Sequence, residues 1–256
     1  MEFASRRTAR TYSDRTADAS WLEWARRTLA PSGKDVVDIG CGGGIYTHAF
    51  AACGARSVIG IDRSAQYIDE AVASLPNSDT VMFRVGTAWH TTLPDACADI
   101  VFERALVHHL TEPEMTANAD EAKRLLREDG MLVVQDRTIE DVESADVRYW
   151  IRATLLEAFP RLLGWERARR PSRPRYSALL SRSGFTVVRE LPFEEVRRTY
   201  TSFEQLSEEI HSRKGKSILF ELSDTELERY CDILQEKAVA LPLEEVDLWT
   251  VWVATP

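Results

Sequence analysis

Short apolar runs alternate with longer amphipathic stretches along the first half of the chain. Runs of this length are typical of strands buried on both faces, and their alternation with helical stretches is typical of a doubly wound parallel sheet. We therefore expect an α/β fold. The predicted strands are 35–40, 57–62, 81–86, 98–104 and 130–136.

Two further apolar runs, 185–188 and 246–254, predict a sixth and a seventh strand. About sixty residues separate them, far more than a hairpin needs. Ser202 with Gln205, and Ser223 with Glu226, have the spacing of capping boxes, and each pair opens an amphipathic segment. The pattern therefore predicts a helical insertion at 201–241. A separate irregular region at 137–174 contains a predicted helix at 149–163, and Thr111 with Glu114 opens a helix that we expect to end at 129–130.

The chain turns tightly after the first strand, in the segment VVDIGCGGG at 36–44. Gly40, Gly42 and Gly44 let the backbone approach a ligand closely, and the N–H groups of the next helix face the same crevice. Asp62 follows at the end of the second strand, at the roughly 20-residue spacing from which an acid reaches ribose hydroxyls. These residues indicate a nucleoside cofactor.

Two residues narrow the choice of cofactor. A dinucleotide fingerprint needs a glycine where Ile45 stands, and Asp38 would repel a pyrophosphate. The same carboxylate would attract a ligand that carries an ammonium and a sulfonium group. An NAD-dependent oxidoreductase is therefore the least favoured alternative.

At these positions the chain resembles the class I S-adenosylmethionine-dependent methyltransferases, whose motif [DE]xGxGxG is met by Asp38, Gly40, Gly42 and Gly44. The resemblance implies S-adenosylmethionine as cofactor and S-adenosylhomocysteine as product. It also implies a Rossmann-like seven-stranded sheet with the seventh strand antiparallel, between the fifth and sixth. We expect a single domain over 1–256, with a cofactor core at 35–136 and helical lid additions on the substrate side at 1–30, 137–174 and 201–241.

The resemblance also implies roles for individual residues. Asp38 would hold the methionine amino group, Asp62 the ribose, and Thr87 stands where relatives often carry an acid that accepts a hydrogen bond from the adenine amino group. Ala88 would offer its backbone N–H to the adenine ring. The remaining residues expected to bind the cofactor are Tyr12, Gly40, Cys41, Gly42, Gly44, Arg63, Tyr67, Trp89, Glu103 and Arg104.

The fourth strand leads into FERALVHHL, where His109 and His108 are candidates for accepting a proton from the acceptor. Displacement at a sulfonium needs no proton on the leaving group, so packing is the alternative for both histidines. Six arginines at 161–175 would clamp an anionic acceptor or lie on a solvated loop. Further pocket candidates are Arg213, Ser217, Trp150, Trp165, Tyr176 and Phe203.

Composition limits the partners. With 41 acidic and 32 basic side chains the net charge is −9, which opposes tight binding of DNA. The segment FERALVHHL at the end of the fourth strand also lacks the DPPY or NPPY motif of enzymes that methylate DNA bases. The four cysteines lack the spacing of a metal site, and no apolar run has the length of a membrane span. We expect a cytoplasmic protein that methylates a small organic acceptor and forms a symmetric homodimer if it associates. A methyltransferase of RNA or protein, and a non-enzymatic cofactor-binding protein, are the alternatives.

Overall fold

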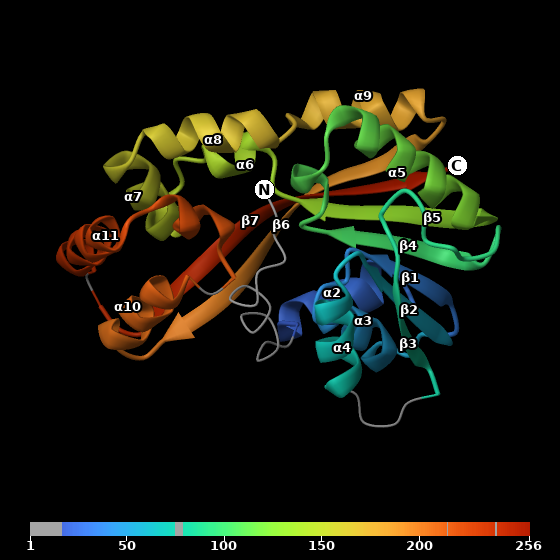
Figure 1. The fold of residues 1–256 in the computed structure, drawn as a ribbon, viewed down its shortest axis with the longest axis horizontal. Helices are drawn as coiled ribbons and strands as arrows, with labels where there is room; N and C mark the ends of the chain where they lie inside the picture. Colours follow the sequence, from blue (N-terminus) through green and yellow to red (C-terminus); the bar gives the residue numbers. More distant parts are fainter. Residues whose placement is uncertain (1–16, 75–78, 214, 239) are drawn as a thin grey trace.

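The computed structural model of the chain describes residues 17–74, 79–213, 215–238 and 240–256. Seven strands form one sheet in the order β3-β2-β1-β4-β5-β7-β6 (Figure 1). The first five strands are parallel, and β7 runs antiparallel between β5 and β6. The predicted seven-stranded, doubly wound sheet is therefore confirmed. The strands are β1 (Asp35–Ile39), β2 (Ser57–Asp62), β3 (Val81–Val85), β4 (Ala98–Arg104), β5 (Leu126–Asp136), β6 (Thr186–Tyr200) and β7 (Leu243–Thr255).

The strand order reverses at β1, which pairs with β2 on one side and with β4 on the other. Ligands of open α/β sheets bind beyond the carboxyl ends of the strands at such a point. Apolar side chains fill the space between the sheet and the helices on each face. One face is covered by α2 (Ala19–Thr28), α3 (Ile45–Ala52) and α4 (Ala65–Ala73), and the other by α5 (Glu112–Leu125) and α9 (Arg173–Arg182).

The outer ends of β6 and β7 form a long ribbon that leaves the sheet and carries helices (Figure 1). The two strands pair from Thr186 with Thr255 to Tyr200 with Leu243. We name this part the cap. Its helices enclose a third hydrophobic core and are α7 (Trp150–Ala158), α8 (Arg161–Arg169), α10 (Phe203–Ser212) and α11 (Asp224–Lys237). The predicted helical insertion at 201–241 lies within it, together with the 3-10 helix η3 (Ser217–Glu221).

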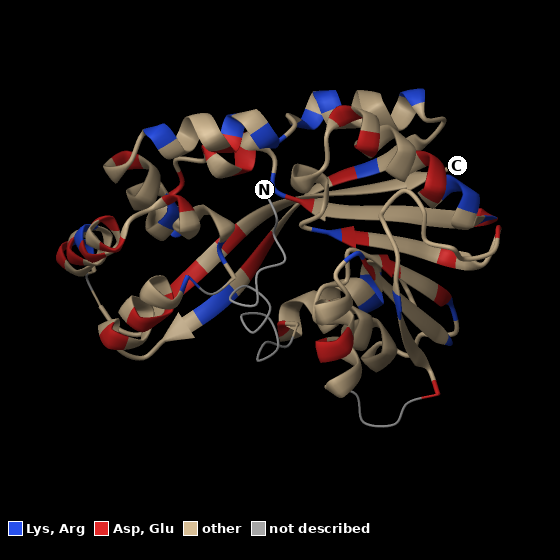
Figure 2. Ribbon diagram, viewed as in Figure 1, with Lys and Arg blue, Asp and Glu red and all other residues tan. Residues whose placement is uncertain are grey.

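Several predicted boundaries are wrong. The sixth strand continues to Tyr200, well beyond the predicted end at 188. The prediction ended too early because charged residues on the exposed ribbon hide the strand pattern, and Figure 2 shows acids and bases interspersed there. The helix predicted at 149–163 is two helices, since Pro160 lacks an N–H and Phe159 leaves the helical conformation. Helix α5 ends at Leu125, before the predicted 129–130, and strand β5 begins at Leu126.

Helix α2 is part of the central structure, in contrast to the lid expected at 1–30. Trp21 is fully buried and packs edge-on against Phe50 and Phe102, and its indole N–H donates to Gln135. Residues 1–16 lie outside the described part of the chain. No helix among the described residues has the length and apolarity needed to cross a membrane.

Candidate active site

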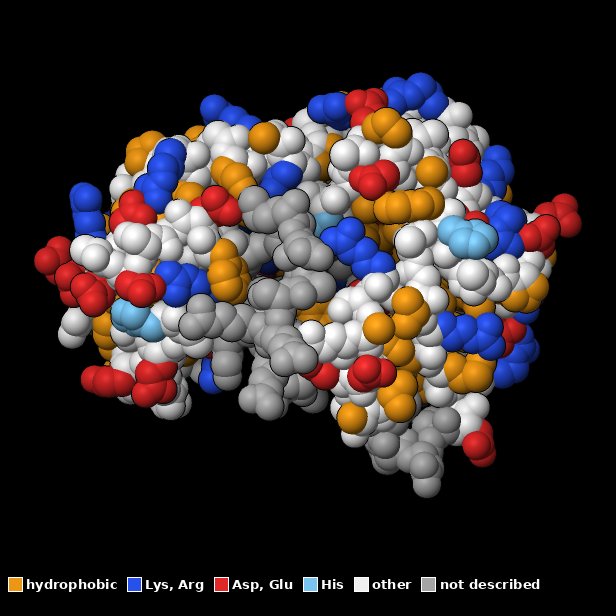
Figure 3. Space-filling model, viewed as in Figure 1, with side chains coloured by type: hydrophobic (Ala, Val, Ile, Leu, Met, Phe, Trp, Pro, Cys, Tyr) orange, Lys and Arg blue, Asp and Glu red, His pale blue; other side chains and the backbone are white. Residues whose placement is uncertain are grey.

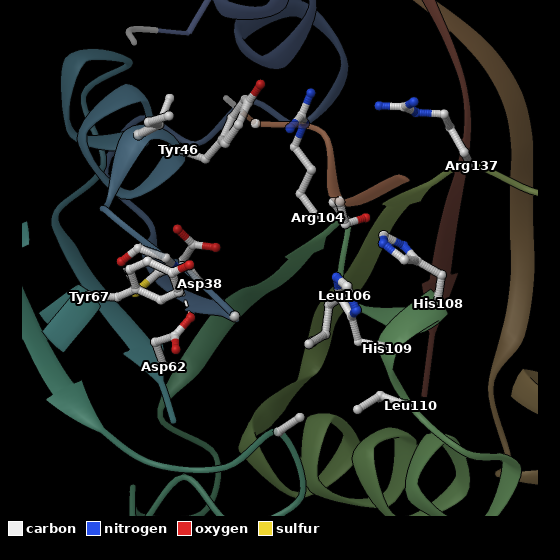
Figure 4. Close-up of a pocket in the computed structure, with 18 of the residues that line it drawn as sticks. Asp38, Tyr46, Asp62, Tyr67, Arg104, Leu106, His108, His109, Leu110 and Arg137 are labelled. Carbon is white, nitrogen blue, oxygen red and sulfur yellow. Dashed lines mark hydrogen bonds between the residues drawn. The ribbon is translucent and has the colours of Figure 1, made fainter. Parts of the chain in front are cut away.

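A cavity of about 290 Å³ opens beyond the carboxyl ends of β1, β2 and β4 and extends to the cap. Residues of β1, β2, β4, β7 and the cap line it, together with the segments that follow β4 and β5. Figure 4 shows Asp38, Asp62, Arg104 and Arg137 among them. Of the residues predicted to bind the cofactor, the lining includes Asp38, Gly40, Cys41, Gly42, Asp62, Arg63, Tyr67, Thr87, Ala88, Trp89 and Arg104. Tyr12 lies outside the described residues.

The glycine turn is held against β2 by backbone hydrogen bonds. The N–H groups of Gly40 and Cys41 both donate to the carbonyl of Ile61, at 2.7 and 3.0 Å. Gly42 has a φ of +52° with no atom near the place of a Cβ, so its backbone faces open space. Gly44 does not line the cavity: with a φ of +83° it precedes α3, and a Cβ there would lie 2.5 Å from the ring of Phe83.

Asp62 ends β2 beside this turn. One carboxylate oxygen accepts from the Gly42 N–H and the other from the Ser64 N–H, both at 2.9 Å. These two bonds fix the side chain at the cavity wall (Figure 4). Each carboxylate oxygen has a second lone pair for a ligand hydroxyl.

Asp38 lies behind Asp62 and is buried. Its carboxylate accepts a hydrogen bond of 2.6 Å from the Thr47 hydroxyl. Burial raises the pKa of Asp38 to about 7, and the Asp62 carboxylate adds to the rise. A cationic ligand beside Asp38 would favour the ionised carboxylate, and the attraction between the two charges would favour binding of that ligand.

Beyond β3, the loop of Thr87, Ala88 and Trp89 forms another wall of the cavity. The backbone of Thr87 exchanges hydrogen bonds with His90, which closes a tight turn. The Thr87 hydroxyl is buried and has no hydrogen-bond partner among the described residues. An orphaned buried hydroxyl in a cavity wall fits a polar ligand group, as expected for an adenine.

Glu103 does not line the cavity, because neighbouring side chains on a strand face opposite sides of the sheet. It points toward α5 and accepts a hydrogen bond from Asn118, and burial raises its pKa to about 8. Arg104 takes the opposite side and enters the cavity. Its guanidinium pairs with Glu195 and stacks on Tyr46 and Trp249 at 4.3 and 4.1 Å.

His108 and His109 follow β4 and both line the cavity (Figure 4). The Nδ1 of His108 lies 2.7 Å from a carboxylate oxygen of Asp136, and the centroids of the two imidazole rings lie 4.1 Å apart with the rings tilted by 43°. The backbone N–H of Arg137 also donates to Asp136, which favours an ionised carboxylate and a proton on Nδ1 of His108. Burial lowers the pKa of both histidines, to about 4 for His109, so both are neutral at neutral pH.

The cap side of the cavity carries charged residues that sequence reasoning did not find. They come from the start of the segment after β5, from α7 and α8, from the α10–η3 loop and from the β6–β7 ribbon. Their positions follow from the path of the ribbon, and no local motif marks them. They are Arg137, Arg152, Glu166, Arg197, Lys216 and Asp247.

The six arginines of 161–175 divide between surface and cavity. Arg169 and Arg170 line the cavity, whereas Arg167 and Arg175 are exposed and pair with Glu143 and Glu112. The expected solvated loop is thus mainly helix α8, and Arg169 at the end of this helix faces the cavity.

The other pocket candidates also divide. Ser217 lines the cavity, while Arg213 donates to the Leu219 and Leu222 carbonyls within the cap. None of the four aromatic candidates lines the cavity, since they pack in the hydrophobic cores or beneath an arginine. Within the described parts of the chain, no group of three or more histidine, cysteine or acidic residues has the geometry to hold a metal.

Part of the chain is similar to known methyltransferases. A family described as a methyltransferase domain matches residues 36–130. A 2-methyl-6-phytyl-1,4-hydroquinone methyltransferase from Synechocystis sp. is 29% identical over 128 residues, 50% of this chain and 40% of that protein. A ribosomal protein L11 methyltransferase from Burkholderia cenocepacia is 36% identical over 92 residues, 36% of this chain and 28% of that protein. The chain thus matches less than half the length of either relative.

Among solved structures, one from Anabaena variabilis, assigned to a methyltransferase of an antibiotic biosynthesis pathway, superposes with a TM-score of 0.72. The match covers 98% of this chain and 100% of that one, at 20% identity. This likeness extends the common fold to the cap as well as the sheet.

Proposed function

We propose that the chain is a class I methyltransferase that transfers a methyl group from S-adenosylmethionine to a small organic acceptor. The match of a methyltransferase domain to residues 36–130 and the fold of the whole chain support this proposal. The observation that carries the proposal is one continuous cavity. It joins the glycine turn and two carboxylates at one end to a histidine–aspartate pair and an enclosed polar chamber at the other.

The residues at the glycine turn fit S-adenosylmethionine. Asp62 would accept from the ribose hydroxyls, Thr87 from the adenine amino group, and Asp38 would offset the charge of the methionine ammonium and the sulfonium. Arg104 borders the same space and has a buried Nε without a partner among the described residues, which suits the methionine carboxylate. When bound, the cofactor supplies an electrophilic methyl group. NAD fits less well, because Asp38 would face its pyrophosphate.

His108 is the better placed of the two histidines to accept a proton. With its Nδ1 proton directed to Asp136, the ring presents Nε2 as the proton acceptor, and the Asp136 carboxylate stabilises the imidazolium that forms. His109 contacts the His108 ring and lies close enough to Arg169 for the guanidinium to lower its pKa. We assign His108 as the general base for an acceptor that must lose a proton, and Asp136 as its positioning residue.

The enclosure of the basic residues favours a small acceptor over RNA or a protein. Arg170, Arg197 and Lys216 are at most about a tenth exposed in their side chains. A nucleic-acid enzyme would present such residues on an open face. On the part of the face that Figure 3 colours by residue type, charged side chains of both signs are dispersed.

The proposal is tested by incubating the protein with methyl-labelled S-adenosylmethionine and a cell lysate separated by ultrafiltration. We expect label in the low-molecular-weight filtrate and a slower transfer by His108→Gln, with unchanged affinity for S-adenosylhomocysteine. Label in the retained protein or RNA would contradict a small acceptor. Tight cofactor binding with no transfer to either fraction would identify a non-enzymatic binding protein.

A further inference from the structure

The cap side of the cavity holds more positive than negative charge. Four guanidinium groups, those of Arg137, Arg152, Arg169 and Arg170, lie there within ion-pair distance of three carboxylates. The three carboxylates are Glu166, Asp247 and Asp136, so the cluster carries a surplus of one positive charge when all three are ionised.

Glu166 is the centre of this cluster and is fully buried. Three arginines share its two oxygens: Nη1 of Arg152 at 3.5 Å, Nε of Arg169 at 2.9 Å and Nε of Arg170 at 2.5 Å. Burial alone would raise the pKa of Glu166, but the three guanidinium groups outweigh it and lower the pKa to about 2. The carboxylate is therefore ionised, and its single negative charge pairs with three positively charged side chains.

Arg170 is satisfied by this arrangement, whereas Arg152 is not. Arg170 also donates to the carbonyl of Arg137 and pairs with Asp136, which fixes α8 to the end of β5. Arg152 makes no hydrogen bond with any described residue, since its nearest carboxylate oxygens lie at 3.5 and 3.8 Å. Its side chain is 17% exposed and lines the cavity.

Arg169 lies beside Arg152, because both contact Glu166. Its guanidinium is supported by the Trp165 ring at 3.7 Å and donates to the Ser217 hydroxyl at 3.3 Å. These contacts place the guanidinium between α8 and the α10–η3 loop. Arg169 also lies close enough to His109 to lower its pKa, so this end of the cluster borders the histidines.

We propose that the acceptor carries a carboxylate group, which Arg152 and Arg169 bind at the cap end of the cavity. A single negative charge matches the surplus of the cluster, and a planar guanidinium suits a carboxylate that accepts two parallel hydrogen bonds. The rest of the acceptor then extends toward His108 and His109. This inference rests on the proposed function, because it describes the acceptor of the methyl group. Binding of an anion at Arg152 and Arg169 can nevertheless be measured without any methyl transfer.

The test uses benzoate as probe, with benzamide as its neutral isostere and phenyl phosphate as a dianion, each titrated by calorimetry. We expect benzoate to bind at least about tenfold more tightly than benzamide, the size of one charge-assisted hydrogen bond. Arg152→Gln should remove this preference and Arg152→Lys should retain part of it. Arg167→Gln is the matched control, because Arg167 lies on the same helix as Arg169 but is exposed and pairs with Glu143.

Equal affinity for benzoate and benzamide would overturn the inference, as would equal effects of Arg152→Gln and Arg167→Gln. Tighter binding of phenyl phosphate than of benzoate would overturn the assignment of a singly charged carboxylate to this site. Thermal unfolding of each variant identifies a purely structural role, in which Arg152→Gln lowers the unfolding temperature and leaves the probe preference intact.

A parallel titration with S-adenosylhomocysteine separates this inference from the proposed function. Binding of that nucleoside without discrimination between the probes contradicts the anion site alone. Discrimination between the probes without nucleoside binding contradicts the proposed function and supports the anion site.

Discussion

Three carboxylates at the ends of neighbouring strands have different environments, and these set their roles. Asp62 accepts two backbone hydrogen bonds at the cavity wall, Asp38 is buried behind it, and Glu103 is buried on the opposite face of the sheet. Burial raises the pKa of all three, to about 7 for Asp38 and about 8 for Glu103. Substitution therefore has a different consequence at each residue.

Asp62→Ala is expected to weaken the binding of S-adenosylhomocysteine by about 2 to 3 kcal/mol, because two charge-assisted hydrogen bonds to the ribose are lost. Calorimetry measures the affinity directly. Asp69→Ala, on the helix that follows Asp62, serves as the control. An unchanged affinity for Asp62→Ala would exclude this residue from ribose recognition.

Asp38 makes cofactor affinity depend on pH. Its pKa of about 7 in the free protein means that the carboxyl is half protonated near neutral pH, and a cationic ligand binds the ionised form. Affinity for S-adenosylmethionine should therefore rise about tenfold from pH 6 to pH 8. Asp38→Asn should bind more weakly at pH 8 and show a flat profile, and an equally steep profile in that variant would assign the titration to another group.

Glu103 gives a prediction about stability that is independent of function. Its folded pKa is raised to about 8, so its contribution to stability is complete at low pH and is lost as the pH rises through that value. Between pH 6 and 9 the loss is on the order of 2 to 3 kcal/mol. Denaturant unfolding of Glu103→Gln should show a correspondingly smaller loss, and identical pH dependence of both proteins would contradict a protonated Glu103.

At the scale of elements, replacing a glycine by alanine is expected to change the stability of the fold in opposite directions, depending on the backbone conformation of that glycine. Gly44 combines a φ of +83° with close contact to Phe83, whereas Gly164 lies inside α8 with open space around it. Gly44→Ala is expected to destabilise the fold by about 2 kcal/mol, and Gly164→Ala to stabilise it by about 0.5 to 1 kcal/mol. Chemical denaturation of both variants measures the two effects. Equal effects would show that the backbone at Gly44 tolerates a side chain.

Local motifs predicted the sheet and the glycine-turn end of the cavity because strand, turn and helix there are consecutive in sequence. Asp38, Gly40, Gly42 and Asp62 meet for this reason. The prediction for Glu103 is wrong because it ignored the alternation of side chains along β4. Arg152 could not be predicted, since its position depends on how a long ribbon and a helix break at Pro160 bring the cap over the sheet.

At the scale of the whole molecule, two hydrophobic cores flank the sheet and a third lies within the cap. The cavity lies between the sheet and the cap, so one end is built by the segment at 36–130, which matches a methyltransferase domain, and the other by segments that follow it. Under the proposed function, the cofactor would lie at the first end and the acceptor at the second. A homodimer remains our expectation for an associating form.

The most direct test of the account is thermal unfolding of the protein with S-adenosylmethionine, S-adenosylhomocysteine and NAD, each at about one hundred times a micromolar dissociation constant. Selective binding should add about 2.7 kcal/mol of stability, which corresponds to a rise of roughly 5 to 10 °C in the midpoint. We predict this rise with the two sulfur nucleosides and none with NAD. A rise with NAD alone, or with none of the three, would contradict the assignment of the cofactor.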